Sequence, residues 1–183
     1  MPEYRRVKLK GATYFFTLVT YQRQRIFSSP EPISLLTECF DRIKTYHPFK
    51  IDAYCILPDH IHFIWSLPEV DNNYSMRIGQ IKRRFTNEYS KRFEISNEKN
   101  ESRKKRKESI IWQRRFWEHW IRDENDLNHH IDYVHYNPVK HGLVSRAQDW
   151  KNSSFHEFVE MGYYDRDWGE NYKNDQEKYQ FGE

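Results

Sequence analysis

Residues 49–67 read FKIDAYCILPDHIHFIWSL, and this stretch decides the fold. It contains two runs rich in apolar residues, and only the short turn at residues 57–59 separates them. Two such runs with so short a connection favour an antiparallel β-hairpin. Because side chains alternate across a strand, His60 and His62 are expected to project from the same face, about 7 Å apart.

Outward from this hairpin, the spacing of apolar residues alternates between strand and helix patterns. The run YFFTLVT at residues 14–20 is typical of a strand. Residues 75–93 repeat apolar side chains every three or four positions, as an amphipathic helix does. The remaining predicted elements are a helix that begins near Pro30, a strand region over residues 110–121 with an irregularity near Arg114 and Arg115, and a helix over about residues 123–136 that Pro138 ends.

The predicted order is therefore β-α-β-β-α-β-α, and its first six elements match the ferredoxin-like (split βαβ) layout. We predict an α+β fold with a four-stranded antiparallel sheet and helices, followed by a C-terminal helix and tail. A chain of 183 residues fits one such domain. We place it at residues 1–168, with a basic mobile loop at about 96–108 and a polar tail at 169–183, and we expect only partial order beyond Trp150.

The composition excludes several classes of protein. Mean hydropathy is −1.04, and no apolar run approaches the ~20 residues that a membrane span needs, which excludes an integral membrane protein. The charged and aromatic N-terminus has no signal-peptide pattern, so a cytoplasmic location is expected. Cys39 and Cys55 lack a CxxC spacing and are interpreted as reduced core residues.

Charge is distributed unevenly along the chain. The net charge is only +3, but residues 76–107 carry 12 basic and 4 acidic side chains, whereas residues 108–183 carry 9 basic and 15 acidic ones. Basic side chains suit a phosphate backbone, and aromatic rings can stack on unpaired bases. The pattern favours a nucleic-acid partner, and a solvated charged loop is the alternative interpretation of the basic block.

Two groups of side chains could carry chemistry. Two imidazoles on one strand face, as at His60 and His62, can hold a divalent metal through one nitrogen each, although ordinary polar positions would show the same pattern. The second group is HHIDYVHYNPVKHG at residues 129–142, in which Tyr133 and Asn137 are four residues apart and share a helix face. A tyrosine and an amide that reach one metal would form an active site.

Three motifs in this order, PDHIHFIW, WQRRFWEH and HHIDYVHYNPVKHG, resemble the REP-associated tyrosine transposases, members of the HUH superfamily of single-strand DNA nucleases. The resemblance runs from EYRR at residues 3–6 to about Trp168. It implies a ferredoxin-like, HUH-type catalytic domain that binds hairpin-forming repetitive extragenic palindromes (REP elements). It also implies a transposase-like endonuclease and strand transferase that cleaves and rejoins the adjoining single-stranded DNA.

The resemblance further implies the roles of individual residues. His60 and His62 would hold a divalent ion, Mg²⁺ or Mn²⁺, and Asn137 would be the third ligand. Tyr133 would attack a phosphodiester and form a 5′-phosphotyrosine intermediate, with Tyr136 as the competing nucleophile. A metal-activated phosphate is required because a free phenol, with a pKa of about 10, is a weak nucleophile.

Further residues are expected around this site. Glu118 and His119 would hydrogen-bond to a metal ligand without contacting the metal themselves. The expected partner is single-stranded DNA that carries a hairpin, and no membrane partner is expected. The protein is expected to act as a monomer or weak homodimer and to be associated with the nucleoid. The candidates for DNA contact are Tyr4, Arg5, Arg6, Arg77, Lys82, Arg83, Arg84, Trp112, Arg114 and Arg115.

Three other functions are compatible with the sequence. The first is a non-catalytic nucleic-acid-binding module of the same fold. The second is an RNA-binding ferredoxin-like domain that uses sheet aromatics, which predicts neither metal dependence nor a covalent adduct. The third is a metal-dependent hydrolase that uses water, in which Tyr133 is only structural.

Overall fold

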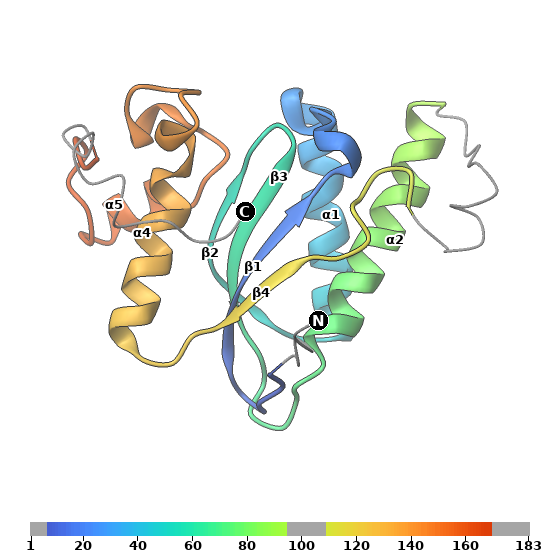
Figure 1. Cartoon of the computed structure of the whole chain (residues 1–183), viewed down its shortest axis with the longest axis horizontal. Coiled ribbons are helices and arrows are strands. Elements are labelled where there is room, and N and C mark those ends of the chain that lie inside the picture. Colours follow the sequence, from blue (N-terminus) through green and yellow to red (C-terminus); the bar gives the residue numbers. More distant parts are fainter. Residues whose placement is uncertain (1–6, 95–108, 170–183) are drawn as a thin grey trace, which may run out of the picture.

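The computed structural model describes residues 7–94 and 109–169 (Figure 1). The predicted DNA contacts Tyr4, Arg5 and Arg6, the basic loop at about 96–108, and all of the predicted tail except Gly169 lie outside the described residues. The elements are β1 (Thr13–Val19), η1 (Tyr21–Arg23), η2 (Ile26–Ser28), α1 (Pro30–Tyr46), β2 (Lys50–Ile56), β3 (His60–Ser66), α2 (Tyr74–Arg92), β4 (Trp117–Trp120), α4 (Glu124–Lys140), η3 (Ala147–Asp149) and α5 (Phe155–Glu160).

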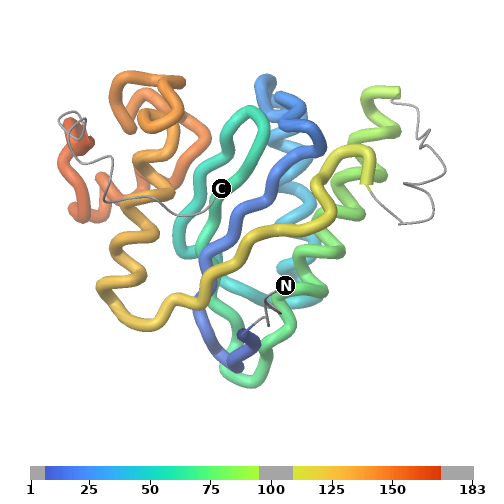
Figure 2. Tube along the Cα trace, in the orientation of Figure 1, coloured from blue at the N-terminus to red at the C-terminus, as the bar shows by residue number. Residues whose placement is uncertain are grey.

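The predicted hairpin is confirmed. β2 and β3 pair antiparallel with Cys55 opposite His62, and the backbone N–H of Leu57 donates to the carbonyl of His60 across the turn at 2.9 Å. β1 lies on the other side of β3, and β4 pairs with β1, so the strand order is β2-β3-β1-β4 (Figure 2). Every neighbouring pair is antiparallel, which confirms the predicted four-stranded sheet in an α+β fold.

Helices cover both faces of this sheet (Figure 1). Tyr14 and Phe16 of β1 are buried in one core with residues of α1 and α2, such as Phe85. Phe15, between them, points to the opposite face and is buried with Tyr133 of α4. Each fully buried side chain of this size stabilises the fold by roughly 1.5–3 kcal/mol. The alternation along β1 therefore assigns α1 and α2 to one face and α4 to the other.

Two predicted elements have different bounds. Within residues 110–121, Trp112 forms an isolated antiparallel bridge with Thr20, and the N–H of Gln113 donates to the carbonyl of Val19 at 2.9 Å. The carbonyl of Gln113 accepts instead from Lys82 Nζ of α2 at 2.6 Å, and the regular strand β4 begins only at Trp117. α4 continues to Lys140 and includes Pro138. Because Pro138 lies in the last turn, it costs the helix only the bond that its missing N–H would donate to the carbonyl of Val134.

The chain after Trp150 is more ordered than predicted. Residues 152–154 run along the outer edge of β2, where the N–H of Ile56 donates to the carbonyl of Asn152 at 2.8 Å. Ser154 Oγ accepts from the N–H of Tyr54 at 2.9 Å and lies 2.8 Å from His135 Nε2 of α4. Burial lowers the pKa of His135 to about 3. Residues up to 169 therefore belong to the folded part of the chain.

Two further expectations concern cysteines and membranes. Cys39 and Cys55 are both buried thiols without a disulfide, as predicted. Burial raises the pKa of Cys39 to about 11. Within the described ranges, no helix has the length and apolar character required to cross a bilayer.

Candidate active site

His60 and His62 form the floor of the site. Both project from the β3 face that α4 covers, and their ring centroids are 4.9 Å apart. They are 2% and 0% exposed, so this is a buried pair and not the half-exposed strand position that the H-x-H pattern also allowed. The predicted shared face is confirmed.

A hydrogen bond to one nitrogen orients each ring. Nδ1 of His60 lies 2.6 Å from Oδ1 of Asp59, in the turn before β3. Nδ1 of His62 lies 3.0 Å from Oγ1 of Thr17, on the neighbouring strand β1. Since a partner on one ring nitrogen fixes the tautomer and leaves the other as the ligand, Nε2 is the atom of each ring that would hold an ion.

α4 and its C-cap residue bring three side chains at four-residue spacing to these histidines. The ring of Tyr133 lies 5.2 Å from that of His62, and the ring of His141, two turns further on, lies 5.1 Å from that of His60. Asn137 is halfway between them at four-residue spacing, so its side chain shares that face. It is fully buried, and within the described residues neither its Oδ1 nor its Nδ2 has a hydrogen-bond partner.

This arrangement fits a divalent metal ion. Leaving a buried amide unpaired costs roughly 1–3 kcal/mol, and such groups in native structures generally have a partner that the protein alone does not supply. A cation held by Asn137 Oδ1 and two imidazole nitrogens would satisfy that oxygen. His60, His62 and Asn137 are thus the three predicted ligands, and the structure places all three on the surfaces where β3 and α4 meet.

The two candidate tyrosines differ in position. Tyr133 is 1% exposed, and Lys140 Nζ lies 3.5 Å from its phenolic oxygen. Tyr136 packs instead against the C-terminal segment, with its ring 6.4 Å from that of Trp168, and burial raises its pKa. Tyr133 is therefore the tyrosine that the fold brings to the histidines.

Comparison with known proteins shows which family the chain is similar to. The family model described as IS200-like transposase matches residues 8–137. A REP-associated tyrosine transposase of Escherichia coli is 41% identical over 168 residues, which cover 92% of this chain and 91% of that protein. A Haemophilus influenzae protein assigned to the same class is 46% identical over 171 residues, 93% of this chain and 95% of that one.

The chain belongs to the IS200-like transposase family. A solved structure described as a REP-associated tyrosine transposase bound to a REP hairpin agrees with this fold at a TM-score of 0.77, with 40% identity over 92% of this chain and 91% of that one. The chain is accordingly a tyrosine transposase of the REP-associated group. Transposases of this superfamily generally use a divalent metal ion, which agrees with the donor set on β3 and α4.

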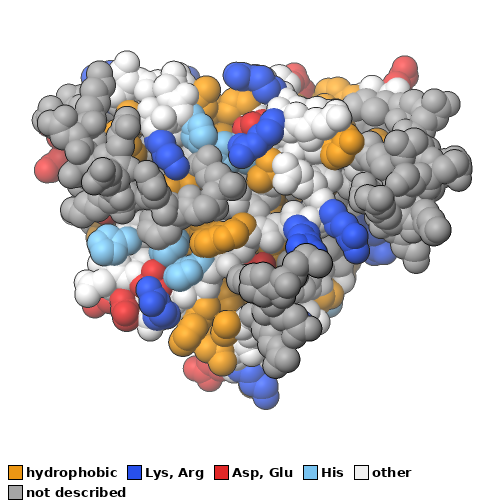
Figure 3. Space-filling model, in the orientation of Figure 1, with side chains coloured by type: hydrophobic (Ala, Val, Ile, Leu, Met, Phe, Trp, Pro, Cys, Tyr) orange, Lys and Arg blue, Asp and Glu red, His pale blue; other side chains and the backbone are white. Residues whose placement is uncertain are grey.

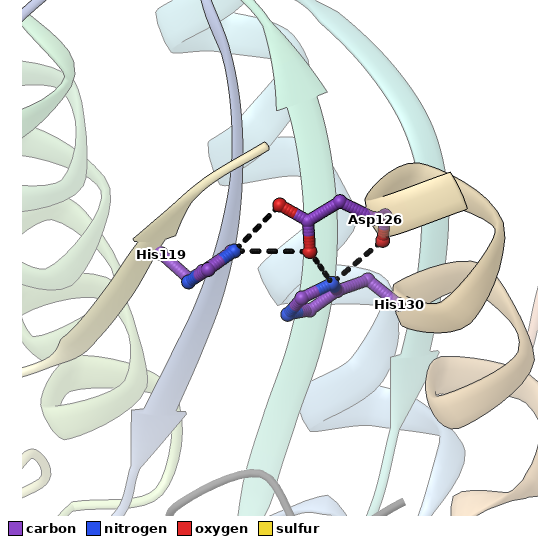
Figure 4. Close-up of side chains that lie close together, drawn as sticks. All are labelled: His119, Asp126 and His130. Atoms are coloured by element: carbon purple, nitrogen blue, oxygen red, sulfur yellow. Dashed lines mark hydrogen bonds and ion pairs between the residues drawn. The ribbon is translucent and has the colours of Figure 1, made fainter. Parts of the chain in front are cut away.

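The predicted outer partners Glu118 and His119 of the transposase do not support a metal ligand. Glu118 is opposite Phe16 on the α1–α2 face of the sheet, where it is 4% exposed. His119 points to the α4 face, but its Nε2 lies 2.9 Å from Oδ2 of Asp126, at the start of α4 (Figure 4). The prediction for Glu118 is corrected because adjacent residues of β4 face opposite sides of the sheet, and that for His119 because its ring nitrogen binds Asp126.

Asp126 is the centre of a separate network on α4. Its Oδ2 accepts hydrogen bonds from the backbone N–H and the Nε of Arg122, at 3.0 and 3.1 Å, and its Oδ1 lies 3.1 Å from Nδ1 of His130 (Figure 4). Burial alone would raise the pKa of Asp126, but the hydrogen bonds from His119 and Arg122 outweigh it and lower the pKa to about 2. The carboxylate therefore joins β4 to the first turn of α4.

His119, Asp126 and His130 have the composition of a metal site but not its geometry. The two imidazole rings are stacked at 17° with centroids 4.5 Å apart. Because a metal ion lies in the plane of each ring that binds it, two nearly parallel stacked rings cannot share one ion well. The network is instead a packing support: the ring of Phe15 lies 5.0 Å from His130, 5.8 Å from Tyr133 and 5.5 Å from His62.

Two of the predicted DNA contacts are structural residues. Arg77 is 1% exposed, and its guanidinium binds Asp71 Oδ2 at 2.6 Å and the carbonyls of His47, Pro48 and Asn73. Trp112 is 1% exposed and packs against Phe27 and Phe85 in the core. The DNA-contact predictions for Arg77 and Trp112 are therefore corrected.

Three others line one groove. Lys82 and Arg83 of α2 and Arg114 of the segment before β4 border a groove of about 380 Å³ that also exposes Phe116. Lys and Arg side chains gather over this part of the visible face (Figure 3). Arg84 and Arg115 are exposed but do not line the groove.

Sequence reasoning missed several neighbours of the metal ligands. Thr17, Asp59, Lys140 and His141, the C-cap residue of α4, lie close to the site without a sequence pattern that was used to place them there. Asp59 immediately precedes the H-x-H pattern and could have been found from its position in PDHIH. Thr17 could not, because its contact with His62 depends on the register between β1 and β3.

Proposed function

We propose that this transposase cleaves and rejoins single-stranded DNA beside hairpins of repetitive extragenic palindromes, through a 5′-phosphotyrosine on Tyr133. The observation that carries the proposal is the convergence of His60, His62 and Asn137 with Tyr133 where α4 crosses β3. Support for the hairpin substrate comes from the related structure that is described as bound to a REP hairpin.

The residues suggest how the chemistry proceeds. The phenolic oxygen of Tyr133 attacks the scissile phosphorus, a P–O bond to tyrosine forms, and the bond from phosphorus to the 3′-oxygen breaks. The phenolic proton is lost to solvent, and the leaving 3′-oxygen ends as a hydroxyl after taking up a proton. When bound by His60, His62 and Asn137, Mg²⁺ or Mn²⁺ supplies Lewis-acid polarisation of the scissile phosphate.

Rejoining follows from the same bond. The phosphodiester to Tyr133 replaces the phosphodiester of the strand, so a 3′-hydroxyl can attack it and release the phenol. Lys140, 3.5 Å from the phenolic oxygen, places a positive charge beside the oxygen that carries negative charge when it leaves. No external energy source is required, because one phosphodiester is exchanged for another.

The basic groove supports a role in holding the DNA. Lys82, Arg83 and Arg114 provide charge for phosphates, and Phe116 provides a ring at the same groove. These contacts do not depend on the metal, so binding and cleavage are separable.

The test uses a labelled single strand that carries a REP-type hairpin, incubated with Mn²⁺ or Mg²⁺ and resolved on a denaturing gel. The parent is expected to form a protein–DNA band that Tyr133→Phe loses and Tyr136→Phe retains. His60→Ala and His62→Ala should lose cleavage and keep hairpin binding. Nicked product without the covalent band in Tyr133→Phe would identify water as the nucleophile, and retention of the band would contradict Tyr133.

A further inference from the structure

Arg23 follows β1 in a backbone conformation that is unfavourable for its residue type. Gln22 and Arg23 have φ values of 53° and 54°, and among the described residues only Glu94 is a further non-glycine residue with positive φ. The left-handed region costs such residues roughly 1–2 kcal/mol each. Consecutive residues of this kind persist where the surroundings impose them, and they concentrate at functional sites.

Hydrogen bonds hold this turn beside Asp59 and His60. The N–H of Thr20 donates to the carbonyl of Asp59 at 2.9 Å, and its Oγ1 lies 2.8 Å from the same carbonyl. The N–H of Tyr21 donates to the carbonyl of Ile111 at 2.7 Å. The 3₁₀ turn η1 is thus fixed to the turn that precedes β3, and Arg23 is placed beside His60.

The guanidinium of Arg23 is at the site but only weakly engaged there. Nη1 lies 3.5 Å from Asp59 Oδ2 and 3.5 Å from His60 Nδ1, both at the limit for a hydrogen bond. Within the described residues, its Nε and Nη2 have no hydrogen-bond partner, and the side chain is 43% exposed. Most of its donors are therefore available to a further group that binds beside His60.

We propose that Arg23 is a further catalytic residue, whose guanidinium contacts a non-bridging oxygen of the scissile phosphate. This inference rests on the proposed function, which puts that phosphate between His60, His62 and Tyr133. The phosphate gains negative charge as Tyr133 attacks, and the protein ligands beside it are neutral. A planar guanidinium with donors directed at phosphate oxygens stabilises that charge most where it is already in place.

A competing role would be structural, since Arg23 could orient His60 through Asp59. The two roles differ in what they change. A contact to phosphate changes the rate of the chemical step and not the metal requirement. A role through Asp59 changes the concentration of metal that is required for activity.

The experiment compares Arg23→Gln and Arg23→Lys with Arg25→Gln, a matched control in which an exposed arginine two residues further on is changed. Formation of the covalent adduct on a hairpin-bearing single strand is followed in a single turnover at saturating Mn²⁺. Arg23→Gln is expected to slow it roughly 100-fold, Arg23→Lys to recover part of the rate, and Arg25→Gln to match the parent. The hairpin Kd and the half-saturating Mn²⁺ concentration should stay within threefold.

A second substrate tests the contact itself. A methylphosphonate at the cleavage position replaces one non-bridging oxygen by methyl, and its two diastereomers replace different oxygens. On the diastereomer that lacks the oxygen contacted by Arg23, the parent and Arg23→Gln should react at rates within threefold of each other. On the other diastereomer the defect of about 100-fold should persist.

Several results would overturn the inference. Arg23→Gln could react within threefold of the parent on ordinary DNA, its defect could coincide with a raised Mn²⁺ requirement, or the defect could persist on both diastereomers. A melting temperature equal to that of the parent checks that the variants fold. If the parent itself forms no adduct, the proposed function fails and this contact fails with it; if only the Arg23 results fail, the proposed function stands.

Discussion

At Asn137, the transposase keeps a fully buried amide without a hydrogen-bond partner among the residues that the structure describes. Such a group destabilises the metal-free protein by roughly 1–3 kcal/mol. Asn137→Leu, which has a similar branched shape, should therefore leave the free energy of unfolding in EDTA unchanged or raise it by about 1 kcal/mol, and should abolish cleavage. Urea unfolding measures the first effect and the gel assay the second.

A matched control for this prediction is Asn128→Leu, at an exposed position of the same helix. We expect that variant to change stability by less than about 0.5 kcal/mol and to cleave like the parent. If Asn137→Leu instead lost more than about 1 kcal/mol in EDTA, the amide would have a structural role and the ligand assignment would be wrong.

Thr17 acts on the site through one bond, from its Oγ1 to His62 Nδ1 at 3.0 Å. Partners that orient a ligand are typically worth 10- to 100-fold in metal affinity. Thr17→Val should therefore raise the Mn²⁺ concentration for half-maximal cleavage by roughly 10-fold or more, without changing the hairpin Kd. Thr13→Val, which removes a bond to Ser66 at the other end of β1, is the control and should leave the Mn²⁺ requirement as it is.

For single residues, the sequence was sufficient to predict how side chains that are close together in the chain are placed relative to one another. The alternation of His60 and His62 and the four-residue spacing of Tyr133 and Asn137 follow from local periodicity. Arg23 and Thr17 could not be found in this way, because their places depend on how β1 pairs with β3 and on the contact between η1 and the turn before β3.

At the scale of elements, Asp126 joins β4 to α4 and so helps to place the helix that carries Tyr133. Its folded pKa of about 2 is below the ordinary value of 3.8, so the folded state binds fewer protons than the unfolded chain between these values. The carboxylate therefore contributes about 2 kcal/mol above pH 4, and this contribution is lost as the pH falls toward 2.

Asp126→Asn should accordingly lower the free energy of unfolding by about 2 kcal/mol at pH 7, and the difference from the parent should shrink as the pH approaches 2. Chemical denaturation at several pH values measures this. Asp149→Asn removes an exposed carboxylate that pairs with Arg146 and should leave the free energy of unfolding nearly unchanged at every pH, because solvent screens this ion pair. A pH-independent difference for Asp126→Asn would contradict the role of its charge.

Elements differed in how well the sequence predicted them. β2, β3 and α2 have strong periodicity and were placed within two residues. α4 was predicted too short because Pro138 was taken as a stop, although the last turn tolerates it. The strand region at residues 110–121 is interrupted: Trp112 forms an isolated antiparallel bridge with Thr20 after β1, and regular pairing resumes only at β4.

At the scale of the whole molecule, the basic groove and the metal site are separate surfaces with separate effects. Replacing Lys82, Arg83 and Arg114 by Gln together should weaken hairpin binding and reduce the slope of log K against log salt by up to about 2, at roughly 0.7 per phosphate contact on a single strand. Fluorescence anisotropy over a salt series measures the slope. Lys44→Gln, on the exposed side of α1, should not change it.

Cleavage by this triple variant at saturating DNA should equal that of the parent, since the proposed metal ligands and Tyr133 are unchanged. An unchanged salt slope would show that the DNA follows another path across the protein. The fold class was predictable from the order of patterns alone, but this groove was not. It forms because the irregular segment before β4 lies against α2, which no local pattern indicates.

The segment at residues 152–154, which pairs with the outer edge of β2, also matters while the chain is being synthesised. The last strand of the sheet ends at residue 120, yet the segment that shields the β2 edge, residues 152–154, is synthesised and emerges only after it. An exposed edge recruits other incomplete chains into aggregates. Premature termination after residue 150 would therefore release a product that retains both histidines and the tyrosine but is prone to self-association. Residues 152–154 thus protect the sheet against aggregation.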